Sequence, residues 1–284
     1  MSRIIADAGS TKIDWVLIDL NGIQHTIQTV GFNPNQQDIS YFERILSELS
    51  AAIPVKDQLL SIRYFGTGCG TFENRQLIAT KLSEHFKIAQ VEVDTDLFAA
   101  ALALCQGEEG IACVLGTGSN SCHFSGKEIL SQVPNLGFIL GDEGSGSWIG
   151  KEIVKAYFYE KLSPQINQAI SKRLPGGRDE LLATIQANVG LNSWFAEFCT
   201  VLSEFPEDEK LQNIVRMAFT EFVETHIQPY AKAQIIPIHF AGSLAFHFQA
   251  KLREIVESRG MTMGRVLQRP IDGLILFDQM NIES

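Results

Sequence analysis

The sequence predicts an α/β protein made of two related halves, each with a mostly parallel sheet covered by helices. A glycine-rich turn between two apolar stretches occurs at residues 4–18 and again at residues 113–124. Behind each turn, stretches with strand character alternate with helical patterns, which is typical of parallel sheets. With 284 residues, of which 45% are hydrophobic and 20% charged, the chain is long enough for two domains. In such folds ligands bind at the carboxyl ends of the strands.

The first half has an order of strands and helices that follows from local signals. Residues 4–8 and 13–18 flank the first turn, and Asn21-Gly22 indicates a hairpin to a third strand. Apolar residues that fall on one face predict a helix over residues 37–51. The segments that follow are a strand at residues 59–65, a helix at 72–86, a strand at 89–93 and an alanine-rich helix at 97–105.

The second half is expected to begin near the acidic loop at residues 106–110, which divides the chain into domains 1–108 and 109–284. Its glycine-rich turn is followed at Ser125-Gly126 by a signal for a third strand. Beyond Gly141 the chain is predicted to be largely helical. Helices are expected at residues 146–162, 164–174, 179–187, 191–202, 208–231 and 244–259, and strands at 235–240 and 263–268.

The composition argues against several classes of function. A formal net charge of −10 without clusters of Lys and Arg argues against nucleic acid or an anionic membrane as a partner. No segment approaches the roughly 18 to 20 apolar residues of a membrane span, and the N-terminus lacks a signal-peptide pattern, so a cytoplasmic protein is expected. The five cysteines lack a C-x-x-C pair and the six histidines lack metal-ligand spacing. Cys69, inside a glycine cluster, is either an exposed nucleophile or, as we favour, a core thiol.

The two glycine-rich turns predict sites for phosphate groups. We call residues 8–12 the first glycine turn and residues 116–119 the second glycine turn. Backbone N–H groups approach a phosphate closely only where no Cβ intervenes. The hydroxyls of four residues add further donors: Ser10, Thr11, Thr117 and Ser119. Two such turns facing each other would bind one polyphosphate. For either turn alone, an ordinary tight hairpin is the alternative.

Acidic residues lie where two of the predicted strands end. Asp7 precedes the first glycine turn, where its carboxylate would repel phosphate unless a cation lies between them, so it is predicted to hold Mg²⁺. A carboxylate that accepts N–H groups of the turn is the alternative. Asp96 follows the strand at residues 89–93 and is predicted to be a helix N-cap, a general base for a hydroxyl group, or both, because the two roles are not exclusive. Asp94, in the same turn, competes with Asp96 for this role.

The glycine-rich loop at residues 136–147 is a candidate substrate site. Its glycines allow a ligand to approach closely, so Asp142 is predicted to bind hydroxyl groups of a polar substrate. The alternative is that Asp142 and Glu143 cap the helix that follows. Gly242 and Ser243 follow a strand and open a helix, where they could contact the adenosine part of a nucleotide.

In these motifs the chain resembles the N-acetylglucosamine kinase branch of the actin, sugar kinase and Hsp70 superfamily, grouped with the BadF/BadG/BcrA/BcrD ATPases. Residues 7–12 and 116–120 resemble the two phosphate motifs of the family, and Ala241-Gly242-Ser243 resembles its adenosine motif. Leu140-Gly141-Asp142-Glu143-Gly144-Ser145 is the most specific element, because this string is characteristic of the branch. The four motifs occur in order over nearly the whole chain.

The resemblance implies two ribonuclease H-like domains of the actin-like ATPase fold with an interdomain cleft, and a terminal segment that returns to the first domain. It implies ATP-dependent phosphorylation of the 6-hydroxyl group of an amino sugar, with N-acetylglucosamine favoured and Mg²⁺ held by Asp7. Asp96 fits the family's catalytic base better than Asp94, because it precedes the alanine-rich helix. The implied contacts to ATP are Gly9, Ser10, Thr11, Lys12, Gly116, Thr117, Gly118, Gly242 and Ser243. Those to the sugar are Asn33, Asp96, Ser119, Asn120, Asn135, Leu136, Gly137 and Asp142.

Two other functions stay open at this point. Activators of the BadF type share the fold but hold an iron–sulfur cluster with cysteines from two subunits, for which no counterpart stands out in this sequence. A non-catalytic sugar sensor would bind a sugar without turnover of ATP. The sequence also leaves open which amino sugar is bound. Members of the family are frequently dimers, so a homodimer is a further expectation.

Overall fold

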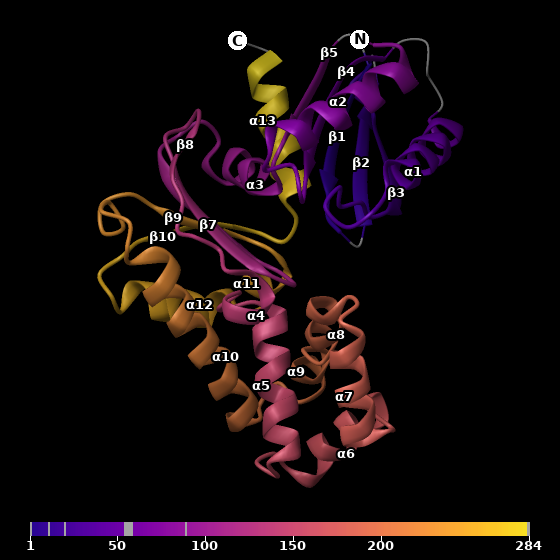
Figure 1. The fold of residues 1–284 in the computed structure, drawn as a ribbon. Coiled ribbons are helices and arrows are strands. Elements are labelled where there is room, and N and C mark those ends of the chain that lie inside the picture. Colours follow the sequence, from indigo (N-terminus) through magenta and orange to yellow (C-terminus); the bar gives the residue numbers. More distant parts are fainter. Residues whose placement is uncertain (1, 11, 20, 54–58, 89, 283–284) are drawn as a thin grey trace. The chain divides into compact units, whose positions relative to one another are not determined.

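The computed structural model describes residues 2–10, 12–19, 21–53, 59–88 and 90–282. The chain divides into two compact units. The first unit comprises Met1–Gly107, Gly126–Glu128 and Arg269–Ser284, and the second unit comprises Glu108–Ser125 and Ile129–Gln268. Each unit contains a five-stranded sheet covered by helices (Figure 1), which confirms the predicted α/β class.

The sheet of the first unit has the strand order β3-β2-β1-β4-β5. Its strands are β1 (Ser2–Ala8), β2 (Lys12–Ile18), β3 (Gln24–Val30), β4 (Leu59–Gly66) and β5 (Gln90–Asp94). Tight turns make β1, β2 and β3 antiparallel, whereas β4 and β5 run parallel to β1 because a helix precedes each of them. The carboxyl ends of β1, β4 and β5 therefore lie at one edge of the sheet.

Helices cover both faces of this sheet. They are α1 (Ile39–Ala52), α2 (Phe72–Phe86), α3 (Asp96–Cys105) and α13 (Pro270–Ile282). In Figure 1, α1 and α2 lie on one face, and α3 and α13 lie on the other. The small, buried alanines of α3 let α13 pack closely on α3 and β1. An ion pair between Arg3 and Asp278 joins α13 to β1, so the last helix of the chain completes the first unit.

The sheet of the second unit repeats this topology, with the order β10-β9-β6-β7-β8. Its strands are β6 (Gly110–Leu115), β7 (Ser119–Phe124), β8 (Ile129–Ser131), β9 (Ile238–Ala241) and β10 (Met263–Leu267). Strands β6, β7 and β8 are antiparallel, and β9 and β10 run parallel to β6. In this arrangement β6 corresponds to β1 and β9 to β4. The two related halves predicted from the glycine turns are thus present in the topology.

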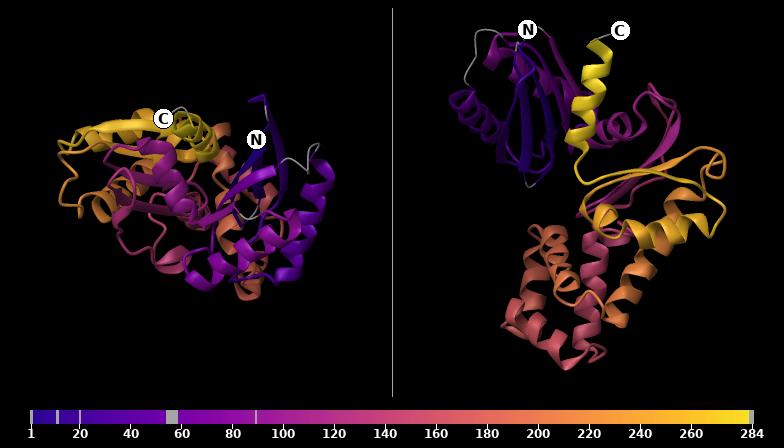
Figure 2. Two further views of the ribbon diagram at one scale, coloured as in Figure 1. Left: turned by 90° about the horizontal axis from the view of Figure 1, so that it is seen from above. Right: turned by 180° about the vertical axis from the view of Figure 1, so that it is seen from behind.

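The second unit also carries a large set of helices. They are α4 (Gly137–Leu140), α5 (Gly146–Phe158), α6 (Pro164–Arg173), α7 (Gly177–Ala187), α8 (Leu191–Glu197), α9 (Thr200–Glu204), α10 (Glu209–Phe222), α11 (Ser243–His247) and α12 (Gln249–Glu257). The right view of Figure 2 shows α6 to α9 beside α5, against which α8 and α10 pack. Among the described helices, none combines the length and the apolar character that crossing a membrane requires.

Three predicted helices are interrupted in the structure. The helix expected at residues 208–231 is α-helical only to Phe222 and continues as a π-helical turn, η2 (Val223–Ile227), where Gln228 N donates to Val223 O at 2.9 Å. The segments at residues 191–202 and 244–259 each form two short helices, α8 with α9 and α11 with α12. Apolar periodicity missed these interruptions because the buried face continues across each of them.

Candidate active site

The first unit brings Asp7, Thr67 and Asp96 to one edge of its sheet. Asp7 lies near the end of β1, and Asp96 begins α3 just after β5. Between them runs the loop after β4. In this loop Thr67 donates its backbone N–H to Ala8 O (2.9 Å) and its hydroxyl Oγ1 to Asp96 Oδ2 (2.7 Å). Thr67 therefore fixes the Asp96 carboxylate close to the first glycine turn.

The cap of helix α3 is Thr95 rather than Asp96. Thr95 Oγ1 accepts from Phe98 N at 3.1 Å, so the interpretation of Asp96 as an N-cap is wrong. Asp96 occupies the first helical position, where the helix dipole favours a negative charge. Asp94 Oδ1 accepts from Thr95 N at 2.7 Å, within its own turn. Of the two acids, Asp96 is the one bonded to Thr67.

The electrostatics around Asp7 suit a cation. Burial, together with the negative charges of Asp96 and Asp14, raises the pKa of Asp7 to about 7, and the positive charges of Lys12 and Arg269 offset this only in part. A divalent cation would favour the charged form of Asp7. Mg²⁺ often takes one or two carboxylates together with water and phosphate oxygens, so Asp7 fits this ion. The described residues contain no group of three or more His, Cys, Asp or Glu side chains that could bind a metal.

Lys12 is engaged within its own hairpin. Its Nζ donates to Asp14 Oδ2 (2.8 Å), and Gln28 Nε2 donates to Asp14 Oδ1 (2.7 Å). Burial disfavours the charge of Asp14, but these two donors hold its pKa below the usual value. The side chain of Lys12 is half exposed, so a phosphate contact would require its ammonium to leave Asp14.

The first glycine turn is tightly packed on one side and exposed at its tip. Gly9 N donates to Lys12 O at 2.9 Å, and Ser10 is exposed. Thr11, a predicted ATP contact, lies outside the described residues. Gly31, which the sequence did not select as a site residue, packs against the turn, and a Cβ there would lie 2.3 Å from the carbonyl carbon of Ser10. Only a glycine at this position leaves the turn undisturbed.

Asn33 lies against the same loop as Thr67. The side chain of Asn33 is buried, and its Oδ1 accepts from Asn35 N at 3.0 Å. A Cβ at Gly68 would lie 2.5 Å from this oxygen, and the φ of 82° at Gly68 also favours glycine. The first unit thus brings Asn33 to the loop that fixes Asp96.

In the second unit, the start of α5 fixes the second glycine turn. Gly116 N donates to Gly118 O (3.0 Å), which closes the turn. Gly146 N donates to Gly116 O (2.8 Å) and Ser147 N to Thr117 O (3.0 Å). Both carbonyl groups are therefore bonded to the helix, and the backbone of the turn is held in one conformation.

Gly242 packs directly on the second glycine turn. It lies between β9 and α11 with a φ of 118°, and a Cβ there would come within 2.2 Å of Leu115 O and 3.3 Å of Gly116 N. Ser243 is exposed beside it. The predicted adenosine segment and the predicted phosphate turn are therefore neighbours.

Ser119, Asn135, Gly137 and Asp142, all predicted sugar contacts, form one group beside this turn. Ser119 N donates to Asp142 Oδ1 (3.3 Å), and Asn135 Nδ2 donates to Ser119 O (2.5 Å). Asn135 Oδ1 accepts from Gly137 N (2.6 Å), and a Cβ at Gly118 would lie 3.1 Å from Asp142 Oδ1. Burial raises the pKa of Asp142. Within the described residues Ser119 Oγ is buried without a hydrogen-bond partner, so this hydroxyl is available to a ligand.

Two predicted sugar contacts, Asn120 and Leu136, have no side-chain hydrogen bond to this group among the described residues. Asn120 Oδ1 accepts from Ser121 N (2.9 Å) and from Gln132 Nε2 (3.0 Å), so its amide oxygen is engaged near the end of β8. Leu136 is 63% exposed, with its neighbour Gly137 bonded to the group. Neither side chain is brought to Asp142 by a hydrogen bond that the structure shows.

The interpretation of Asp142 and Glu143 as helix caps is wrong. Ser145 caps α5, and its Oγ accepts from Trp148 N at 3.1 Å. The carboxylate of Glu143 instead contacts a histidine, with Oε2 lying 2.9 Å from His226 Nε2. This leaves Asp142 as the acid of the loop that is associated with the second glycine turn.

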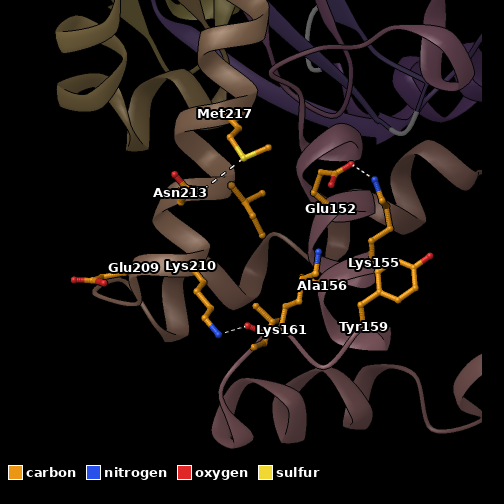
Figure 3. A pocket seen from close by; sticks show the side chains of 11 residues that line it. Glu152, Lys155, Ala156, Tyr159, Lys161, Glu209, Lys210, Asn213 and Met217 are labelled. Carbon is orange, nitrogen blue, oxygen red and sulfur yellow. Dashed lines mark hydrogen bonds and ion pairs between the residues drawn. The ribbon is translucent and has the colours of Figure 1, made fainter.

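A pocket of about 770 Å³ lies elsewhere in the second unit, between α5 and α10 (Figure 3). Figure 3 shows Lys155 paired with Glu152 (2.7 Å) and Lys210 bonded to the carbonyl oxygen of Lys161. None of the residues that line it is a predicted site residue. We assign this pocket no catalytic role.

Comparison with models of protein families gives no match, and neither does comparison with curated protein sequences. Among solved structures, one from Porphyromonas gingivalis, described as a candidate N-acetylglucosamine kinase, shares 32% identity at a TM-score of 0.92, over 98% of this chain and 99% of its own. One from Chromobacterium violaceum with the same description shares 19% identity at a TM-score of 0.75, over 97% and 98%. The ROK hexokinase of Thermus thermophilus shares 16% identity at a TM-score of 0.55, over 99% and 100%.

The latter two comparisons show a common fold. The first shows a closer relation, because its 32% identity extends over nearly the full length of both chains. That relation agrees with the two glycine turns, the Asp142 loop and the Gly242 segment, which occur in the order that the resemblance in sequence requires. The chain belongs to the N-acetylglucosamine kinase-like branch of the actin-like sugar kinase superfamily.

Proposed function

We propose that this protein transfers the γ-phosphoryl group of ATP to the 6-hydroxyl group of an amino sugar, with N-acetylglucosamine as the preferred substrate. Membership in the sugar kinases supports phosphoryl transfer to a sugar. The observation that carries the residue assignment is the 2.7 Å hydrogen bond from Thr67 Oγ1 to Asp96 Oδ2. It fixes a carboxylate at the carboxyl ends of parallel strands, where ligands bind in α/β folds.

Asp96 is the proposed general base. It accepts the proton of the sugar hydroxyl while the hydroxyl oxygen forms a bond to the γ-phosphorus, and the bond to ADP breaks with its electron pair leaving on ADP. The Asp96 carboxylate lies at the start of α3 and accepts a hydrogen bond from Thr67 Oγ1 at 2.7 Å. A general base contributes a factor of about 10² to 10⁴ in rate, and positioning and electrostatics supply most of the rest.

The two glycine turns are the proposed phosphate sites. Residues 9–12 and 116–118 would bind the β- and γ-phosphates through backbone N–H groups other than those of Gly9 and Gly116, which close their own turns. Gly242 and Ser243 would lie against the adenosine. Asp7 would hold Mg²⁺, which when bound neutralises charge on the phosphates. The packing of Gly242 on Gly116 supports a nucleotide site in this part of the second unit, because it places both predicted contacts side by side.

Asp142 is the proposed acceptor for sugar hydroxyl groups. Its Oδ1 is fixed by Ser119 N, and the unpartnered Ser119 Oγ beside it adds a donor. Asn135 and Asn33 are the other proposed contacts whose side chains are held by the surrounding backbone. Asn120 and Leu136 remain proposals from the family resemblance.

The test is a coupled assay of ADP release with N-acetylglucosamine, glucosamine and N-acetylmuramic acid, in which NMR locates the phosphate on the product. We expect N-acetylglucosamine to give the highest kcat/KM and a 6-phosphate product. ADP release without any sugar, from anaerobically purified protein that contains iron, would instead identify an activator. Sugar binding without release of ADP would identify a sensor.

A further inference from the structure

A buried imidazole contacts the part-buried carboxylate that follows the proposed sugar acceptor in the chain. Glu143 directly follows Asp142, and its Oε2 lies 2.9 Å from Nε2 of His226, whose side chain is 2% exposed. Because the Glu143 carboxylate is bonded to His226, it is engaged away from the group around Asp142. We propose that His226 is a positioning residue, which acts through Glu143 to set the orientation of Asp142. This proposal rests on the proposed function only for the identity of the ligand that Asp142 binds.

The loop that carries Asp142 needs such a restraint. Asp142 has a φ of 59° and Gly144 a φ of 77°, so Glu143 is flanked by two residues in the left-handed region. Residues other than glycine adopt this region at a cost in conformational energy, although aspartate tolerates it better than most. The bond from Ser119 N to the Asp142 carboxylate measures 3.3 Å, which is beyond the usual range, and a side-chain hydrogen bond with Asn135 is a second restraint. The contact of Glu143 with His226, at 2.9 Å, is shorter than the bond of Ser119 N with Asp142 and links the residue next to Asp142 to η2.

His226 is itself held in place on two sides. Its ring stacks on Phe222, with centroids 5.1 Å apart and an interplanar angle of 22°. Its backbone oxygen accepts from Ser121 Oγ at 2.9 Å, which joins it to β7. Phe222 also packs on the loop, since a Cβ at Gly144 would lie 2.7 Å from Phe222 Cβ. The end of α10 and the turn η2 thus contact the Asp142 loop through both Phe222 and His226.

The hydrogen-bond inventory of His226 identifies its donor. Nδ1 is buried and has no partner among the described residues. A proton on Nδ1 would therefore be an unpaired buried donor, whereas a proton on Nε2 is satisfied by Glu143. His226 therefore donates from Nε2 to the Glu143 carboxylate. A side chain at position 226 that lacks this donor would leave the Glu143 carboxylate without its hydrogen bond.

Two substitutions separate the donor from the ring. His226→Phe keeps an aromatic ring that can stack on Phe222 but lacks the donor, and His226→Gln keeps an N–H donor near the position of Nε2 but lacks the ring. Glu143→Leu removes the acceptor from the other side of the pair. Glu224→Gln is the matched control, because Glu224 lies on the same turn but is exposed and pairs with Arg259 (2.8 Å) instead of with His226.

In the sugar-dependent assay we expect His226→Phe and Glu143→Leu each to raise the sugar KM about tenfold, with the KM for ATP changing less than threefold, because a small misplacement of a binding group has a large effect. The double variant should be no worse than either single variant, since both remove one contact. His226→Gln should restore the KM to within about threefold of the wild type. Equal sugar KM values for His226→Phe and the wild type would overturn the proposal, as would failure of His226→Gln to restore the KM.

A second measurement does not depend on catalysis. Hydrogen exchange of the backbone amides of Ser119 and Ser145, which donate to Asp142 at 3.3 and 3.1 Å, should accelerate in His226→Phe and Glu143→Leu but not in Glu224→Gln. Unchanged exchange in both of the former variants would overturn the positioning role even in an active kinase. A wild type without sugar-dependent turnover would overturn the kinase proposal, while the exchange experiment would still decide the role of His226.

Discussion

Replacing Asp96 with asparagine removes the proposed base while retaining the size of the side chain. The Thr67 hydroxyl, now 2.7 Å from Oδ2, can accept a hydrogen bond from the new amide as readily as it donates to the carboxylate, so the loop after β4 should keep its place. The cap of α3 is Thr95, which the substitution does not touch. The loss should therefore fall on the chemical step, as a decrease in kcat of about 10² to 10⁴, or about 2.7 to 5.4 kcal/mol in the barrier.

The assay for this prediction is sugar-dependent ADP release at saturating sugar and ATP, with binding of Mg·ATP followed separately by calorimetry. Affinity for Mg·ATP should stay within a few-fold of the wild type, because the proposed phosphate contacts are backbone groups. Asp94→Asn is the matched control, since Asp94 bonds only to the backbone N–H of Thr95 among the contacts described. A kcat within a few-fold of the wild type would refute the assignment, and the same large loss in Asp94→Asn would transfer the role to that residue.

Four further substitutions test other parts of the structure. Thr67→Val removes the donor to the Asp96 carboxylate, a hydrogen bond worth about 1.5 to 3 kcal/mol, so kcat should fall by about 10- to 150-fold with little change in ATP affinity. Asp7→Ala should weaken the binding of Mg·ATP in calorimetry while the melting temperature stays similar; unchanged affinity and turnover would make Asp7 structural. Gly242→Ala should lower the stability by at least about 1 to 3 kcal/mol in denaturant titration, because its φ is 118° and a Cβ would meet a backbone oxygen at 2.2 Å. Burial lowers the pKa of His239 from 6.5 to about 4. Between these pH values the imidazole stays neutral in the folded protein but takes up a proton in the unfolded chain. The free energy of unfolding should therefore fall by about 3 kcal/mol as the pH falls from 6.5 to 4. His239→Asn should remove that part of the pH dependence, and an unchanged profile would show that His239 does not cause it.

The class of the fold and its duplication are predictable from the sequence because the signals are local. Each glycine turn joins two apolar strands that are neighbours in the chain, and the helices that precede β4 and β5 require parallel pairing with β1. The interruption at η2 was not predictable in the same way. Residues 208–231 keep one apolar face throughout, and the change to a π-helical turn becomes visible only in the hydrogen bond of Gln228 with Val223.

The choice between Asp94 and Asp96 as the proposed base depends on a contact with a part of the chain that is distant in sequence. The sequence Asp94-Thr95-Asp96 contains three residues that can cap a helix, and local rules do not rank them. The structure separates them because Thr67, 29 positions before Asp96, donates to only one of the acids. Thr67 lies in the glycine cluster at residues 66–70, in which Cys69 is the other residue with a reactive side chain. Burial raises the pKa of the Cys69 thiol to about 12, so this cysteine is the core thiol that we favoured.

The repeated topology has different residue types at corresponding positions of the two units, and these residues make different contacts. In the first unit the residue after β4, Thr67, bonds to Ala8 at the end of β1; in the second unit the residue after β9, Gly242, packs on Leu115 at the end of β6. These are corresponding places, since β4 and β9 occupy the same position in their sheets. A threonine at this place supplies a hydroxyl that fixes Asp96, whereas a glycine leaves space beside the second glycine turn. Substituting each residue by the type found in the other unit should therefore fail in different ways: Thr67→Gly should lower kcat in a folded protein, and Gly242→Thr should destabilise the second unit through the clash at Leu115.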